Sequence, residues 1–167
     1  LLFEIKKHSL NKMLHSQSEY EIKLEETYNA FKDIKAHRIS GPGATDVECI
    51  YSGMKFNVEA KSTSNKLGGL NRGRIEDHMN KTKANYTLVI APDFAPAVYK
   101  SDIRNSSISV LETGVFCEYV MSQYFSMGRE NLEYKELHEL IMQNLGENIT
   151  SKVSERNSMI FGLDKKI

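Results

Sequence analysis

Residues 46–61 read DVECIYSGMKFNVEAK, and this stretch carries the strongest structural signal in the chain. Two strand-like runs, residues 46–51 and 54–61, flank Ser52-Gly53, a pair that fits a two-residue hairpin turn. Such a turn pairs Tyr51 with Met54 and, counting outward, sets Asp46 opposite Glu59. The segment therefore predicts an antiparallel β-hairpin with two carboxylates facing each other at its open end.

Strand alternation divides the second run of the hairpin between two faces. One face is uniformly apolar and is expected to pack on the core: Met54, Phe56, Val58 and Ala60. The other face carries Glu59 and Lys61, preceded by Lys55 and Asn57. The hairpin thus predicts a core side and a side on which ionisable groups gather.

Hydrophobic periodicity in the rest of the chain predicts helices and buried strands around this hairpin. Residues 18–34 are expected to form one helix, because Tyr20, Leu24, Tyr28 and Phe31 recur at spacings of three and four. Residues 86–91 (YTLVIA) form a continuous apolar run that favours a fully buried strand. The other predictions are a loop at 65–73, helices at 75–84, 97–105, 115–125, 134–145 and about 149–156, and a strand at 108–111. The order predicts α/β: one domain with a mixed β-sheet flanked by helices.

Length and composition narrow the class of protein. The 167 residues fit one domain, and 22 basic residues balance 22 acidic ones. Zero net charge counts mildly against a free-standing nucleic-acid binder, which usually has a basic excess. Cys49 and Cys117 are far apart in apolar surroundings, so we expect buried thiols in a reducing cytoplasm. No membrane span or signal peptide is evident, and the initial Leu1 suggests a piece of a longer protein.

The open end of the hairpin combines the groups that hydrolysis of a phosphodiester needs. Two facing carboxylates, Asp46 and Glu59, repel each other, and a divalent cation would remove that repulsion. Both carboxylates, the Ala60 carbonyl and water suit the octahedral shell of Mg²⁺. Lys61 is then placed to orient or deprotonate the attacking water and to offset phosphate charge. The alternative is an ordinary solvated hairpin face, on which acidic and basic residues often meet without any function.

Asp46 followed by Glu59-Ala60-Lys61 resembles the PD-(D/E)xK nucleases, with Thr45 in place of the usual proline. The resemblance extends over most of the chain and is nearest to the FokI-type cleavage domain of type IIS restriction endonucleases. The later runs, 89–94 and 109–112, occur in the same order and at similar spacing. In that family an acidic residue on a preceding helix completes the site. Glu21 is at the matching distance before Asp46, and Glu25 is the alternative.

The resemblance implies a role for each of these residues. Asp46, Glu59 and the Ala60 carbonyl would bind Mg²⁺, with Mn²⁺ as a substitute, Lys61 would act on the water, and Glu21 would hold a metal-bound water or a second ion. The loop and helix residues Lys66, Arg72 and Arg74 would approach the DNA backbone. We expect His78 to be an inert histidine on a helix surface. Glu76 and Asp77 are expected to be a charged helix face, or part of a dimer interface as in the family.

The expected function is therefore that of a restriction-type DNA endonuclease. Residues 1–167 would be a cleavage domain, forming the C-terminal part or a subunit of a larger restriction enzyme in the prokaryotic cytoplasm. The implied partners are double-stranded DNA, a separate DNA-recognition domain or subunit, and a second copy in a transient dimer for double-strand cleavage. A repair or junction-resolving nuclease of the same fold is one alternative, and a non-catalytic DNA-binding or scaffold domain is another. The neutral net charge predicts weak, salt-sensitive DNA binding by the isolated chain.

Overall fold

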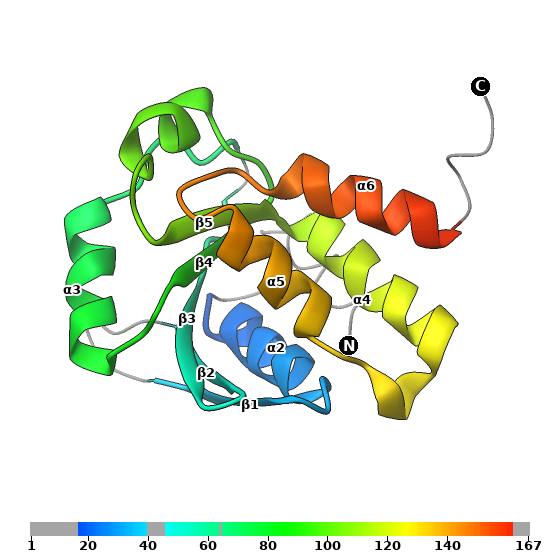
Figure 1. Ribbon diagram of the computed structural model, residues 1–167. Coiled ribbons are helices and arrows are strands. Elements are labelled where there is room, and N and C mark those ends of the chain that lie inside the picture. The colour runs from blue at the N-terminus through cyan, green and yellow to red at the C-terminus, as the bar shows by residue number, and fades with distance from the viewer. Residues whose placement is uncertain (1–16, 40–45, 64, 162–167) are drawn as a thin grey trace, which may run out of the picture.

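A five-stranded mixed sheet organises the protein in the computed structural model, which describes residues 17–39, 46–63 and 65–161 (Figure 1). The strand order is β1-β2-β3-β4-β5; β1, β2 and β3 are antiparallel, and β3, β4 and β5 are parallel. The strands are β1 (Ile34–Arg38), β2 (Val47–Tyr51), β3 (Met54–Ala60), β4 (Thr87–Ala91) and β5 (Ile108–Glu112). The helices are α2 (Gln17–Asn29), α3 (Arg72–Thr82), α4 (Thr113–Met127), α5 (Lys135–Gln143) and α6 (Thr150–Phe161), with short turns η1 (Val98–Asp102) and η2 (Arg129–Asn131). The predicted mixed sheet flanked by helices is confirmed.

The hairpin has the predicted register. Tyr51 pairs with Met54, and the ladder continues outward to Val47 and Val58. Ser52 and Gly53 both have positive φ, at 47° and 77°, which is the backbone of a type I′ turn and matches the right-handed twist of the flanking strands. Asp46 lies one residue before β2, just outside the ladder between β2 and β3. It follows in the same register, at the end of the hairpin where β3 reaches Glu59.

The prediction of one helix over residues 18–34 is wrong. Helix α2 ends at Asn29, and residues 34–38 instead form edge strand β1, paired with β2. The Asn29 side chain holds this turn, since its amide donates to the Ala36 carbonyl and its Oδ1 accepts from the Ala36 amide, both at 2.8 Å. Ile34 and Ala36 of β1 alternate with polar residues and pack on the core, but two apolar positions are too few to distinguish a short strand from the end of the preceding helix.

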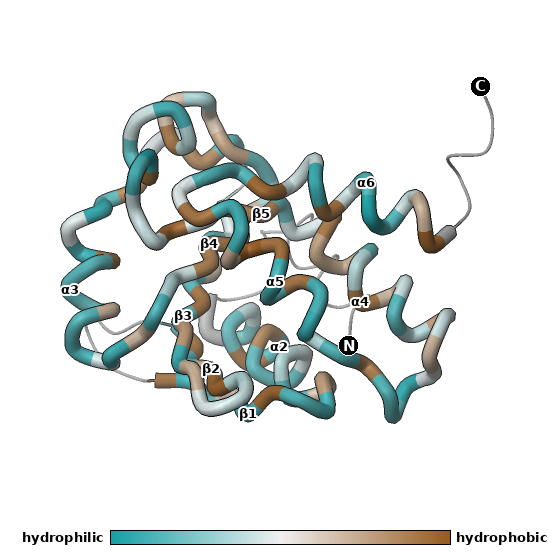
Figure 2. Tube along the Cα trace, in the orientation of Figure 1, coloured by the Kyte–Doolittle hydropathy of each residue, from teal (hydrophilic) through white to brown (hydrophobic). Residues whose placement is uncertain are grey.

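Helices cover both faces of the sheet. On one face, α2, α4 and α5 pack on apolar side chains of β2–β5, including an aromatic group of Tyr28, Phe56, Phe116 and Tyr134 with ring centroids 5.0–6.0 Å apart. On the other face, α3 and η1 cover Val89, Ala91, Ile108 and Val110. Figure 2 shows α3 as mainly hydrophilic, in contrast to the strands behind it. The sheet therefore has a large apolar core on one face and a smaller, partly polar one under α3.

The remaining elements differ from expectation mainly at their ends. The helix predicted at 75–84 begins three residues earlier, at Arg72, and the one predicted at 97–105 contains only a single π-helical turn, η1. The predicted strands at 86–91 and 108–111 and the later helices are present within a few residues. Cys49 and Cys117 are both buried, as expected. No helix among the described residues is long and apolar enough to cross a membrane.

Candidate active site

The ends of β2 and β3 bring Asp46, Glu59 and Lys61 together at one edge of the sheet. Glu59 is the penultimate residue of β3, and parallel pairing with β4 aligns it with Val89. Lys61 is the first residue after β3. Its amide donates to the Ile90 carbonyl at 2.9 Å, which extends the pairing with β4 beyond the end of the strand. This anchored backbone places the acidic and basic side chains of the Glu-Ala-Lys stretch on the same side of β3.

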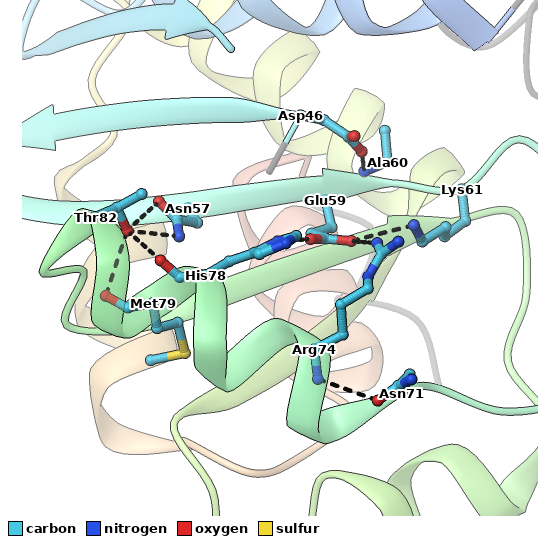
Figure 3. A network of polar contacts seen from close by, with 10 residues as sticks. All are labelled: Asp46, Asn57, Glu59, Ala60, Lys61, Asn71, Arg74, His78, Met79 and Thr82. Carbon is cyan, nitrogen blue, oxygen red and sulfur yellow. Dashed lines mark hydrogen bonds and ion pairs between the residues drawn. The ribbon is translucent and has the colours of Figure 1, made fainter. Parts of the chain in front are cut away.

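Three cationic or hydrogen-bonding side chains surround the carboxylate of Glu59, which is only 1% exposed (Figure 3). Lys61 Nζ lies 3.1 Å and Arg74 Nη2 3.0 Å from Oε2, while His78 Nδ1 lies 3.3 Å from Oε1. Burial alone would raise the pKa of Glu59, but Lys61, Arg74 and the His78 hydrogen bond together lower it. Glu59 is therefore an ionised carboxylate in a nearly closed environment.

Asp46 has the opposite electrostatic character. Its Oδ2 accepts a 2.6 Å hydrogen bond from the Ala60 amide, which ties the start of β2 to the end of β3. Burial raises the pKa of Asp46 to about 6, and the negative charges of Glu59 and Glu21 add to the effect against the opposing influence of Ala60 and Lys61. A cation bound between Asp46 and Glu59 would stabilise the charged form of Asp46, which burial and the neighbouring carboxylate otherwise disfavour.

Glu21 and Glu25, the two candidates for the helix acid, differ in their surroundings. Glu21 lies near enough to Asp46 for its charge to raise the pKa of that carboxyl. Glu25, one turn further along α2, accepts a hydrogen bond from the backbone amide of Arg38 on β1. Glu25 therefore has a structural partner on the edge strand, and Glu21 is the acid that faces the hairpin end.

Helix α3 supplies Arg74 and His78, the two side chains whose contact with Glu59 was not predicted from the sequence. Asn71 caps its start by accepting from the Arg74 amide at 3.1 Å. Asn57 of β3 and Thr82 fasten its other end through a 2.9 Å hydrogen bond. The expectation that His78 lies on the helix surface is wrong: it is 5% exposed and contacts Glu59. The sequence does contain a signal for the burial of His78. This histidine lies three residues after the apolar Ile75, and residues three apart share a helix face.

Of the three basic residues expected to contact DNA, Arg74 contacts Glu59 directly, and each of the three has a protein partner. Lys66 lies 3.5 Å from Asp93, Arg72 bonds Glu76 and the Arg104 carbonyl, and Arg74 bonds Glu59. Glu76 is thus an ion-pair partner within α3. A pocket of about 240 Å³ opens beside the carboxylate, lined by Glu59, Lys61, Leu67, Gly69, Leu70, Asn71, Arg74 and Ile75. DNA contact by these side chains remains a prediction.

The carboxylates of Asp46 and Glu59 are the oxygen donors that this end of the sheet offers to a divalent ion. Within the described ranges, no group of three or more His, Cys, Asp and Glu side chains is arranged to hold a metal. Mg²⁺ is usually held by only one or two carboxylates with water and substrate oxygens completing its shell. Asp46 and Glu59 supply two carboxylates; burial, with a lesser contribution from the charges of Glu59 and Glu21, raises the pKa of Asp46, and a divalent ion would offset this cost. The residues present therefore fit such an ion.

Comparison with known proteins agrees with the fold. No protein-family profile matches the chain. The chain is 36% identical over 160 residues to the type II restriction enzyme HgaI of Avibacterium volantium, in a match that spans 95% of this chain and about a third (32%) of that protein. The small subunit of the heterodimeric restriction endonuclease R.BspD6I has a similar structure, with a TM-score of 0.63 and 13% identity, covering 96% of this chain and 98% of that one. The chain is thus homologous to part of a type II restriction enzyme and has a restriction-endonuclease-like fold.

Proposed function

We propose that the chain is a divalent-metal-dependent DNA endonuclease domain of the PD-(D/E)xK type, similar to the FokI-type cleavage domain of type IIS restriction enzymes. The observation that carries this proposal is the buried Glu59 carboxylate, 3.1 Å from Lys61 and beside Asp46. Charged side chains are almost never fully buried unless they are paired, and a buried carboxylate paired with basic groups beside a pocket is a candidate functional site. Homology to part of a type II restriction enzyme supports the same activity.

The residues of this edge divide the chemical work. Asp46, Glu59 and the Ala60 carbonyl would hold Mg²⁺, or Mn²⁺ in its place. The bound ion would supply a Lewis acid that polarises the phosphate and offsets its charge. Lys61, which is 28% exposed, orients the attacking water and withdraws negative charge from the phosphate. Glu21 holds a further water or a second ion from the α2 side. Water attacks in line with the scissile bond and leaves a 5′-phosphate and a 3′-hydroxyl.

The DNA backbone approaches through the 240 Å³ pocket beside Glu59. Lys66, Arg72 and Arg74 exchange their acidic partners for phosphate oxygens, and this exchange weakens intrinsic DNA binding. Sequence recognition belongs to a separate domain or subunit, since this chain spans only about a third of its curated relative. Each site cuts one strand, so double-strand cleavage uses a transient dimer. The enzyme acts in the cytoplasm of a prokaryotic cell.

A plasmid-cleavage assay with Mg²⁺ at high protein concentration tests the proposal. We expect Asp46→Ala, Glu59→Gln and Lys61→Ala each to abolish cutting, while the wild type converts supercoiled plasmid to nicked or linear forms. Calcium should support DNA binding without cutting, because it binds oxygen ligands with looser geometry. Cutting that survives Lys61→Ala would contradict the assignment.

Glu48→Gln is the matched control variant. Glu48 belongs to the same hairpin, opposite Asn57, but its carboxylate is paired with His37 on β1 at 2.9 Å. It loses the same charge as Glu59→Gln at a place two residues from Asp46. We expect Glu48→Gln to cut like the wild type, so a loss specific to Glu59 identifies the site rather than the hairpin.

A further inference from the structure

The two oxygens of the Glu59 carboxylate have different kinds of partner. Oε2 contacts Lys61 and Arg74, whose side chains are 28% and 45% exposed. Oε1 contacts His78, which is only 5% exposed. On the premise of the function proposed above, we propose that His78 is a positioning residue: it donates from Nδ1 to Oε1 and holds Glu59 so that Oε2 is presented to the metal ion.

Burial makes this hydrogen bond a firm constraint. Both partners are almost fully enclosed, so water does not compete for the Glu59 oxygen that His78 contacts. A carboxylate that is free to rotate offers either oxygen, whereas one bonded on a single side offers only the other. Figure 3 shows the imidazole entering from the α3 side, between Glu59 and the body of the helix. The ligand oxygen is therefore set in orientation before an ion arrives.

The position of His78 is itself determined by a matched spacing between strand and helix. Asn57 bonds Thr82 and Glu59 bonds His78, so two strand residues two apart meet two helix residues four apart. Two residues of strand span about 6.6 Å and four residues of helix about 6 Å, so both contacts form without distortion. Thr82 also donates to the His78 carbonyl at 2.9 Å, which joins the two contacts.

Lys61 and Arg74 serve a different purpose from His78. Lys61 is half-buried and Arg74 is exposed, so both side chains have room to move away from Oε2, and an ion bound to that oxygen would displace them. His78 lies on the opposite oxygen and stays in place. Partners that orient metal ligands in this way are commonly worth 10–100-fold in metal affinity. Loss of His78 is therefore expected to weaken metal binding even though it does not touch the ion.

Calorimetric titration of the full chain with Ca²⁺ tests the inference without cleavage. We expect His78→Leu, which retains burial but removes the donor, to weaken Ca²⁺ binding by about 10–100-fold. His78→Gln, which restores an N–H donor, should recover most of the affinity. In the presence of Mg²⁺, His78→Leu should lower the cleavage rate constant while the KM for DNA stays near the wild-type value.

His138→Gln is the control for the loss of a buried histidine. His138 is 8% exposed and also bonds through Nδ1, to the Tyr86 hydroxyl at 3.1 Å, on the other face of the sheet. We expect its substitution to lower the melting temperature without changing Ca²⁺ affinity. A merely structural role of His78 would give the same result, and that outcome would overturn the inference.

Two comparisons separate failure of the inference from failure of the proposed function. If Glu59→Gln binds Ca²⁺ as tightly as the wild type, the proposed metal site is wrong. If Glu59→Gln loses binding and His78→Leu does not, the metal site stands and the role of His78 is wrong. Nitrogen NMR of the wild-type chain gives a test that needs no folded variant. The inference requires a proton on His78 Nδ1, and an unprotonated Nδ1 would refute it.

Discussion

Replacement of Asp46 by Asn is expected to stabilise the metal-free chain at neutral and alkaline pH. Burial and the neighbouring charges of Glu59 and Glu21 raise the pKa of Asp46 from its ordinary value of 3.8 to about 6. A shift of that size corresponds to about 3 kcal/mol against the charged carboxylate. Because the side chain is partly exposed, solvent screening reduces the expected gain to about 1–2 kcal/mol. Asn retains an oxygen that can accept from the Ala60 amide, so the contact between β2 and β3 is kept.

The sign of the pH dependence follows from the direction of the pKa shift. A carboxyl whose pKa is higher in the folded state favours folding at low pH and loses that contribution as pH rises through about 6. The stability advantage of Asp46→Asn should therefore be full near pH 8 and vanish near pH 4. Urea denaturation of both proteins in EDTA, at several pH values, measures this difference.

Addition of Mg²⁺ should reverse the order of stability. An ion that binds only the folded state stabilises the wild type by mass action and has little effect on Asp46→Asn. The reasoning is refuted if Asp46→Asn is less stable than the wild type near pH 8 in EDTA, or if its stability difference does not change with pH. Glu48→Gln serves as the control. Because the Glu48 carboxylate is paired with His37 and not with another carboxylate, its replacement should give no comparable gain in stability.

Three further results are expected. Glu21→Gln should lower the plasmid-cleavage rate about tenfold or more, whereas Glu25→Gln should leave it near the wild-type rate; the reverse result would exchange their roles. Ser52→Asn should raise the free energy of unfolding, measured in urea, by up to about 1 kcal/mol, because Asn tolerates the φ of 47° at this turn position better than Ser. Arg74→Gln should tighten Ca²⁺ binding about two- to fivefold in calorimetry, because it removes an exposed competitor for Oε2 of Glu59. Weaker binding would mean that Arg74 supports the carboxylate instead.

Local sequence determined the hairpin and the position of its ionisable groups. Ser52-Gly53 specifies the turn, the turn specifies the register, and alternation then places Glu59 and Lys61 on one face. The apolar run of β4 likewise predicted a buried central strand. These features depend on residues close together in the chain, so periodicity and turn chemistry are sufficient to predict them.

Only the tertiary structure shows which elements distant in the sequence meet around the hairpin. Strand β1 is paired along β2, whereas its own five residues, with only Ile34 and Ala36 apolar, form too short a pattern to predict a strand. His78 faces Glu59 because α3 lies across β3, where the bond between Asn57 and Thr82 sets the alignment. The periodicity of α3 alone does not predict this alignment. The placement of α2 likewise brings Glu21 near Asp46 and Glu25 to the Arg38 amide of β1, and the role of Glu21 in the site stays a prediction. Contacts between elements depend on how their surfaces pack together, whereas the pattern within each element depends only on its own residues.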